Sequence, residues 1–246
     1  MPKLLVLGIF VVTLAAQPAS ALDITSCAQL VENDETGVLV TDLTCPSNGV
    51  VAGVLSASGR ATGRVTIQLN GHTISAATGI LCNARCTIEG PGTISGGISG
   101  IYVATAPGDL TLRNLTIEGA EYGVGQGGRI TTLENVTIND NEEAGLVLYT
   151  VRRLKGTNVT VSGNGGWGIK ADEAQIKLTN LTALDNAGGA VIASKRSVTL
   201  IDSTLAGNAF DVFGWRRPKL INTSCELSQG PNPDGSFHTW GVCAND

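Results

Sequence analysis

Three side chains of this chain have the types that removal of a proton from a sugar acid would require. Such a reaction needs a base, a cation that neutralises the developing enolate, and a proton donor. Lys170 could be the base, with Arg153 or Lys195 as the cation and Tyr149 as the donor. The alternative is that Lys170 and Asp172 form an ordinary exposed ion pair, which would contribute less than about 1 kcal/mol to stability.

Aromatic and basic residues accompany this set. They suit an acidic polysaccharide, because rings stack on sugar faces and guanidinium groups pair with carboxylates. The predicted substrate-binding residues are Tyr102, Asp172, Lys195, Arg196 and Trp215. The competing interpretation is that the rings are apolar cover on a β surface.

A repeat of 21–23 residues must position these residues. Short apolar runs begin with a small residue, and their first apolar positions are Ile101, Val124, Leu146, Ile169, Val191 and Val212. A phrase of the form N-x-T recurs in the same phase, and a lone Asn closes successive units at Asn141, Asn164, Asn186 and Asn208. Repeats of this length indicate a solenoid, in which each unit buries its apolar face by stacking on its neighbours.

Each unit contains three short runs in which apolar residues alternate with polar ones, which indicates half-buried strands. No unit has room for an amphipathic helix of about 10 residues. The fold class is therefore all-β, as a right-handed parallel β-helix of about 22 residues per coil. The hand follows from the bias of parallel crossovers. The closing Asn residues should take the left-handed conformation at sharp turns and stack their side chains.

Alternation also assigns the outward residues of the Gly-led strand in each unit. They are Tyr102, Gly125, Val147, Lys170, Ile192 and Phe213. Two residues further on lie Ala104, Gly127, Tyr149, Asp172, Ser194 and Trp215. Since Lys170 and Lys195 are about one coil apart, they are expected to stand near each other on adjacent strands.

Several runs carry a resemblance to a known family: VTIQLNGHTISA from Val65, CTIEGPGTISGGISGIYVA from Cys86, and the N-[LV]-T-[IVA] phrases. On these residues the chain resembles the right-handed parallel β-helix superfamily, the pectin-lyase-like fold. Lyases, polygalacturonases, epimerases and non-catalytic proteins share that coil, so the resemblance implies the fold and leaves the activity open. The polygalacturonase signature is missing: Gly71-His72 is in reverse order, and Ser95 stands where an Asp is common.

The N-terminus is typical of a signal peptide, predicted over residues 1–21. Lys3 precedes an apolar stretch from Leu4 to Ala16, and Ala19-Ser20-Ala21 fits the cleavage rule. The stretch is shorter than the about 18–20 residues that span a bilayer. The predicted location is therefore secreted or extracellular, or periplasmic or cell-surface in a bacterium, with no membrane span after cleavage.

The rest of the chain divides into an N-terminal cap (22–64), the β-helix (65–225) and a C-terminal cap (226–246). The first cap is expected to contain a short helix from Ser26 to Glu32. The six cysteines of an exported chain should be oxidised. A solenoid keeps distant coils apart, which favours the local pairs Cys27–Cys45, Cys82–Cys86 and Cys225–Cys243 and makes the end caps disulfide-stapled.

Charge and motifs exclude several classes of ligand. The net charge is −5, and cleavage of the leader would remove Lys3 and give 16 − 1 − 21 = −6, which does not suit a nucleic-acid-binding protein. No His neighbours a Cys cluster at ligand spacing, and no carboxylate set converges, so neither a metal nor a cofactor is predicted. In a eukaryotic host, glycosylation would fall on Asn114, Asn135, Asn158, Asn180 and Asn222, although the coil alone also explains this N-x-S/T pattern.

The favoured hypothesis is a secreted carbohydrate-active protein that binds an acidic polysaccharide and could cleave or epimerise it. The first alternative is a non-catalytic extracellular structural or adhesive solenoid. A third is a small-molecule isomerase or cyclase. A converging acid–base set on the Gly-led strands would discriminate among them.

Overall fold

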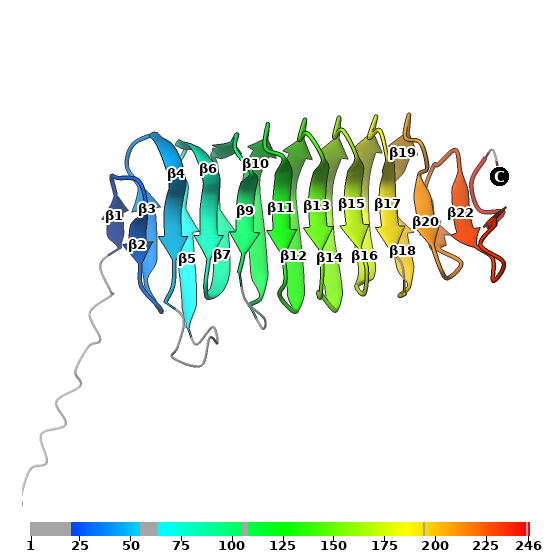
Figure 1. Cartoon of the computed structure of the whole chain (residues 1–246), viewed down its shortest axis with the longest axis horizontal. Coiled ribbons are helices and arrows are strands. Elements are labelled where there is room, and N and C mark those ends of the chain that lie inside the picture. Colours follow the sequence, from blue (N-terminus) through cyan, green and yellow to red (C-terminus); the bar gives the residue numbers. More distant parts are fainter. Residues whose placement is uncertain (1–20, 55–62, 105–107, 194, 245) are drawn as a thin grey trace, which may run out of the picture.

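The computed structural model describes residues 21–54, 63–104, 108–193, 195–244 and 246. Within these ranges the regular secondary structure consists of β-strands without any helix, and the strands stack along one axis (Figure 1). The all-β solenoid prediction is confirmed. The predicted signal peptide, apart from its last residue, lies outside the described residues.

The strands follow one another in chain order along the stack. The N-terminal ones are β1 (Leu22–Ile24), β2 (Gln29–Val31), β3 (Thr36–Leu39), β4 (Leu43–Ala52), β5 (Arg64–Gln68), β6 (Thr73–Cys82), β7 (Arg85–Glu89) and β8 (Thr93–Ser95). The central ones are β9 (Ser99–Val103), β10 (Leu110–Glu118), β11 (Tyr122–Gln126), β12 (Ile130–Asn139), β13 (Ala144–Leu148), β14 (Arg153–Ser162), β15 (Trp167–Ala171) and β16 (Gln175–Leu184). The C-terminal ones are β17 (Gly189–Ala193), β18 (Val198–Ile201), β19 (Thr204–Ala206), β20 (Val212–Gly214), β21 (Lys219–Ile221), β22 (Ser228–Pro231) and β23 (Phe237–Thr239).

A central coil consists of one long bent strand and one short straight strand. β12, for example, bends at Asn135, whose φ of 53° is left-handed, and β13 then completes the coil. We call the run before the bend the first arm, the run after it the second arm, and the short strand the Gly-led strand. The prediction of three short runs per coil is confirmed, with two of the runs joined through a single residue.

Successive coils pair in parallel and in register. Ile130 of β12 pairs with Arg153 of β14, and Arg153 pairs with Gln175 of β16, so the steps are 23 and 22 residues. The inward aliphatic side chains form one continuous core along the solenoid. Each coil therefore buries its apolar side chains only because its neighbours cover them.

The Asn residues that close the units form a buried ladder, which confirms the predicted stacking. The Nδ2 of Asn141 donates to Oδ1 of Asn164 over 2.9 Å, Asn164 donates to Asn186 over 2.7 Å, and Asn186 donates to Asn208 over 2.9 Å. Asn208 donates in turn to Oδ1 of Asp211 over 2.9 Å. We call this set the inner ladder.

The prediction that these closing Asn residues are left-handed is wrong. In each case the preceding residue has the positive φ: Asp140 (53°), Gly163 (66°), Asp185 (55°) and Gly207 (67°). Because the preceding residue makes the bend, the Asn side chain points into the core, where Asn164, for example, is 1% exposed. The left-handed Asn residues are those of the N-x-T phrases, at the bend between the two arms.

The N-terminal segment extends the solenoid, so residue 64 is not a boundary between two architectures. β1 pairs with β3, β3 with β5 and β2 with β4, all in parallel. The predicted helix from Ser26 to Glu32 is wrong, since Gln29–Val31 forms β2. Pairing with Val50–Ala52 of β4 and burial of Val31 outweigh the local helix preference.

The C-terminal tail folds back over the last coil. β23 pairs with β22 as an antiparallel hairpin, unlike the parallel pairs of the coils. The Asp246 carboxylate accepts hydrogen bonds from the backbone amides of Ser228, Val242 and Cys243 at 2.6, 2.7 and 3.0 Å. All three predicted disulfides are present: Cys27–Cys45, Cys82–Cys86 and Cys225–Cys243.

Candidate functional site

The Gly-led strands β9, β11, β13, β15, β17 and β20 form one face of the solenoid, which we call the Gly-led face (Figure 1). Its central outward row is in register, as predicted: Tyr102, Gly125, Val147, Lys170, Ile192 and Phe213. Tyr102 and Lys170 are exposed, whereas Val147 is buried. The row therefore presents one charge, at Lys170, between apolar neighbours.

Two residues further along each strand a second row lies near the next bend. The described members are Ala104, Gly127, Tyr149, Asp172 and Trp215, and the predicted member Ser194 lies outside the described residues. Tyr149 is 52% exposed and Trp215 is 62% exposed. Both rings are therefore accessible to a ligand on this face.

A chain of four aromatic rings crosses the C-terminal part of the Gly-led face. Trp167 stacks on Phe210 with ring centroids 6.5 Å apart, Phe210 meets Phe213 edge-on at 6.4 Å, and Phe213 meets Phe237 edge-on at 5.6 Å. Of these four, only Phe213 was predicted to lie on the surface. Alternation in β15 places Trp167 on the inward side with Ile169, and Phe237 comes from the tail, where no repeat assigns a position.

The three predicted catalytic residues are exposed but do not contact one another. Lys170 lies in the middle of β15, Tyr149 in the bend after β13, and Arg153 at the start of β14, beyond that bend. Among the described residues no hydrogen bond or ion pair joins any two of these side chains. These three side chains therefore do not orient one another, and a substrate would have to lie within hydrogen-bond reach of each of them.

Lys195 pairs with Glu173 of the preceding coil, with Nζ and Oε1 2.8 Å apart. The hydrogen bond from Lys195 lowers the pKa of the Glu173 carboxyl, and the same bond raises the pKa of Lys195. The expectation that Lys195 stands beside Lys170 is wrong. The coil step here is 22 residues, so Lys170 pairs with Ile192, three residues before Lys195. Arg196 is also exposed on this bend.

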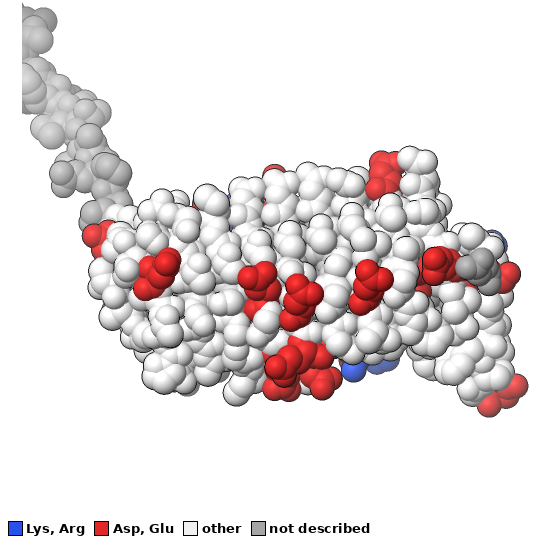
Figure 2. Space-filling model, turned by 90° about the horizontal axis from the view of Figure 1, so that it is seen from above, with Lys and Arg blue, Asp and Glu red and all other residues white. Residues whose placement is uncertain are grey.

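The two borders of the Gly-led face differ in charge. The bends that precede its strands carry Glu121, Asp140, Glu142, Glu143, Asp185 and Asp211 and, within these described bends, no basic residue. Figure 2 looks onto this border and shows acidic side chains along it. The bends that follow the strands carry Arg129, Arg152, Lys195, Arg196, Arg216 and Arg217, beside Asp109, Asp172 and Glu173. An anion is therefore repelled at the first border and attracted at the second.

Tyr122 shows the effect of the acidic border on a neighbouring group. It begins β11, next to Glu121. Burial raises the pKa of the Tyr122 phenol, and the carboxylates of Glu121 and Glu143 raise it further. The phenol therefore stays protonated at neutral pH and can donate a hydrogen bond from this border.

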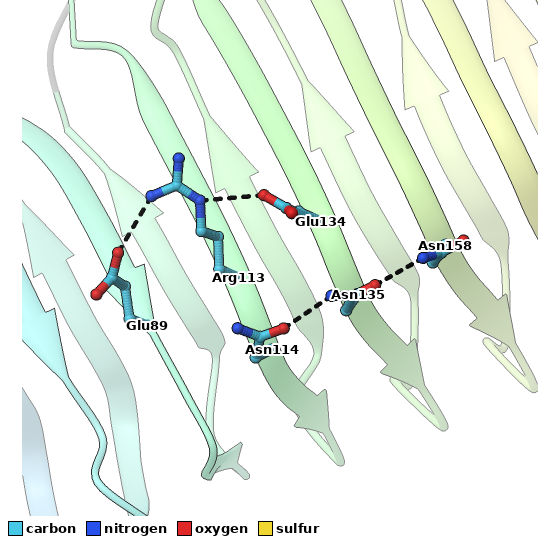
Figure 3. A network of polar contacts seen from close by, with 6 residues as sticks. All are labelled: Glu89, Arg113, Asn114, Glu134, Asn135 and Asn158. Carbon is cyan, nitrogen blue, oxygen red and sulfur yellow. Dashed lines mark hydrogen bonds and ion pairs between the residues drawn. The ribbon is translucent and has the colours of Figure 1, made fainter.

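The five predicted glycosylation sites lie at the left-handed bend between the two arms, with φ between 48° and 55°. Asn135 donates from Nδ2 to Asn114 over 2.8 Å and Asn158 to Asn135 over 2.7 Å (Figure 3). Asn180 donates in the same way to Asn158 over 2.8 Å. We call this exposed row, from Asn114 to Asn180, the outer ladder. Its hydrogen bonds give these Asn residues a structural role whether or not they are modified.

A search of the described residues for three or more His, Cys, Asp or Glu side chains close enough to hold a metal ion finds no such group. His72, whose direction the sequence leaves open, lies with Nδ1 3.2 Å from Oδ1 of Asp42. The backbone amide of Thr73 and the His72 ring lower the pKa of the Asp42 carboxyl. Within the described part of the chain, no helix has the length and apolar character to cross a membrane.

Comparison with known proteins gives one match. A family model described as right handed beta helix region matches residues 62–226. The matched stretch covers the repeat predicted over residues 65–225. Searches of curated proteins and of solved structures give no match.

Proposed function

The chain belongs to the right-handed β-helix family, and from this premise we propose that it is an exported protein that binds an acidic polysaccharide along the Gly-led face. One observation carries the proposal: exposed aromatic rings lie at the border of this face where basic side chains gather. Tyr149 and Trp215 lie in the same bends as Arg152 and Arg216, respectively, and both rings are exposed. The opposite border is acidic and repels a polyanion, so we expect the polymer to bind along the basic border.

The chemistry of this border suits a chain of sugar acids. Rings such as Trp215 offer apolar area to the faces of sugar rings, and the guanidinium groups of Arg196 and Arg216 can donate paired hydrogen bonds to carboxylates. The parallel strands repeat along the solenoid about every 4.8 Å, so successive coils can contact successive parts of a linear polymer. Since the net charge is −5, attraction must come from this local surface and should weaken with salt.

Binding is better supported than catalysis. Lys170, Tyr149 and Arg153 remain the candidates for a lyase or epimerase reaction, with Lys170 as base. Because these three side chains do not contact one another, only a bound polymer that reaches all three could bring them into one reaction. Ultraviolet absorbance of the polygalacturonate mixtures, followed in parallel with the binding experiment, tests for a lyase, because each cleavage by elimination produces an unsaturated product that absorbs ultraviolet light.

The test is a calorimetric titration with polygalacturonate and, in parallel, with a neutral glucan. We expect the acidic polymer to bind and added salt to weaken it. Trp215→Ala should weaken binding by about threefold to tenfold, and Lys170→Ala by about threefold. Lys219→Ala removes an exposed lysine from a first arm, outside the Gly-led face, and serves as the matched control.

The outcomes separate the hypotheses. Loss of affinity with Trp215→Ala and Lys170→Ala but not with Lys219→Ala supports the Gly-led face. Equal affinity of all variants, or no binding of any polyuronate, contradicts the proposal and leaves the structural or adhesive solenoid as the favoured function. Growth of ultraviolet absorbance that Lys170→Ala abolishes would establish a lyase. The small-molecule isomerase or cyclase has no specific observation in its favour.

A further inference from the structure

Two lysines on the first-arm face stand directly opposite each other. Lys155 of β14 pairs in register with Lys177 of β16, both side chains are exposed, and neither forms an ion pair among the described residues. Adjacent parallel strands are about 4.8 Å apart. Like charges directly opposite each other destabilise a sheet. The pair is therefore unfavourable unless a negative charge is present.

A neighbouring row on the same face shows how the protein neutralises charge within its own structure. Arg113 pairs in register with Glu89 on one side and Glu134 on the other, with N–O distances of 3.1 and 3.2 Å (Figure 3). Opposite charges alternate from coil to coil in that row. The row of Lys155 and Lys177 has no such acid, since its other neighbours are Thr132 and Thr199.

The two lysines line a hollow on this face. The hollow has a volume of about 460 Å³, and Thr157 and Thr179, which pair in register with each other, also line it. Its floor includes Gly156, which occupies the row of the buried residues Leu133 and Leu178 but supplies no side chain.

A side chain at Gly156 would be crowded by core residues. A Cβ added there would lie 2.7 Å from Cδ2 of Leu178 and 2.9 Å from Cγ2 of Val159. Core side chains therefore already fill the space beneath Gly156.

From this arrangement we propose that the hollow binds a tetrahedral oxyanion, a sulfate or phosphate group. The ammonium groups of Lys155 and Lys177 would neutralise it, and the hydroxyls of Thr157 and Thr179 would donate to its oxygens. The four donors come from one face of two adjacent strands, so an anion with three or four acceptor oxygens can engage more of them than a carboxylate with two. Glu134 also lines the hollow, but Arg113 engages its carboxylate.

The proposed oxyanion site uses other lysines than the proposed polysaccharide surface. It lies on the first arm, whereas Lys170 and Trp215 belong to the Gly-led face. Arg153 lies two residues before Lys155 in β14 and adds positive charge next to the hollow. The hollow is larger than a single oxyanion needs, so it also has room for the group that a sulfate or phosphate ester carries.

The experiment measures thermal unfolding of the full chain at constant ionic strength while chloride is replaced by low-millimolar sulfate or phosphate. For wild type we expect a saturable rise in Tm of about 2–4 °C. Lys155→Gln and Lys177→Gln should abolish the rise. Lys219→Gln should retain it, because Lys219 lies in the same row with Thr199 between it and Lys177. A sulfated and an unsulfated polysaccharide in parallel distinguish an ester from a free ion.

A charge reversal separates this proposal from a general effect of salt. Lys177→Glu would pair with Lys155 as Glu134 pairs with Arg113, so this variant should have a higher Tm than wild type without oxyanion and no response to it. General stabilisation by sulfate is not saturable and acts equally on every variant. The proposal is overturned if wild type shows no saturable rise, if Lys177→Gln keeps it, if Lys219→Gln loses it equally, or if Lys177→Glu lowers Tm.

Discussion

Two ladders of Asn side chains run along the same coils, and their surroundings differ. The inner ladder is buried, with Asn141, Asn164 and Asn186 at most 1% exposed, and its amides donate toward the C-terminus. The outer ladder is exposed and its amides donate toward the N-terminus. Water can replace a lost hydrogen bond in the outer ladder but not in the inner one. The same amide–amide bond therefore contributes differently to stability.

The two ladders also differ at their ends. The inner ladder begins with the backbone amide of Ala120, which donates to Oδ1 of Asn141, and ends on the buried carboxylate of Asp211. The outer ladder stops in register between Asn180 and Asp202, because an ionised carboxylate has no proton to donate to the Asn180 oxygen. Every donor of the buried ladder has an acceptor, whereas the exposed ladder tolerates a break.

The largest expected effect is on the inner ladder. Asn164→Leu removes the acceptor of both the backbone and side-chain amides of Asn141, which then stay unpaired in the core. We expect a loss of about 1–3 kcal/mol in the free energy of unfolding, measured by guanidinium denaturation. Asn186→Leu should behave alike. Unchanged stability of both variants would show that burial does not decide the contribution of this ladder.

The second-largest expected effect is at Asp211, where the inner ladder ends. Asp211 accepts from Nδ2 of Asn208 and from the backbone amides of Glu226 and Leu227. Asp211→Asn keeps the shape but turns an NH₂ group toward one of these donors. We expect a cost of about 1–2 kcal/mol with little change in the circular dichroism spectrum. A neutral result would mean that water or a side-chain rearrangement can end the ladder equally well.

In the outer ladder, the backbone conformation should matter more than the amide bond. Asn158 has a φ of 55°, which costs Ala about 1–2 kcal/mol and Gly little. We therefore expect Asn158→Gly to be closer to wild type in stability than Asn158→Ala, although both remove the ladder bonds. If the two variants lose the same free energy of unfolding, the amide hydrogen bonds, and not the backbone conformation, account for the contribution of Asn158.

The smallest expected effect is a gain. Asp202→Asn would supply a donor to the unpaired oxygen of Asn180 and keep an acceptor for Asn222, which now donates to Asp202 over 2.7 Å. Because the site is exposed, the gain should be below about 0.5 kcal/mol. Differential scanning calorimetry beside wild type can resolve its sign. A loss of stability would show that the negative charge of Asp202 has a role of its own.

The sequence by itself determined the parts of this protein that repeat. The regular spacing of Gly-led runs and closing Asn residues predicted the all-β solenoid, the register of the Gly-led face and the stacked side chains of the inner ladder. The three local disulfides also followed, because a solenoid brings only neighbouring segments together. These features depend on which residue types recur in the same phase, and that information is local.

Tertiary structure decided the features that depend on the length of a particular coil or on contacts outside the repeat. A step of 22 residues placed Lys195 beside Glu173 and not beside Lys170. Sequence spacing alone also could not show that Lys155 and Lys177 border a hollow. Phe237 reaches the aromatic chain because the tail folds back as a hairpin. A change of one residue in a coil moves a side chain to another position or face, so pairing between strands, and not the motif, fixes which groups meet.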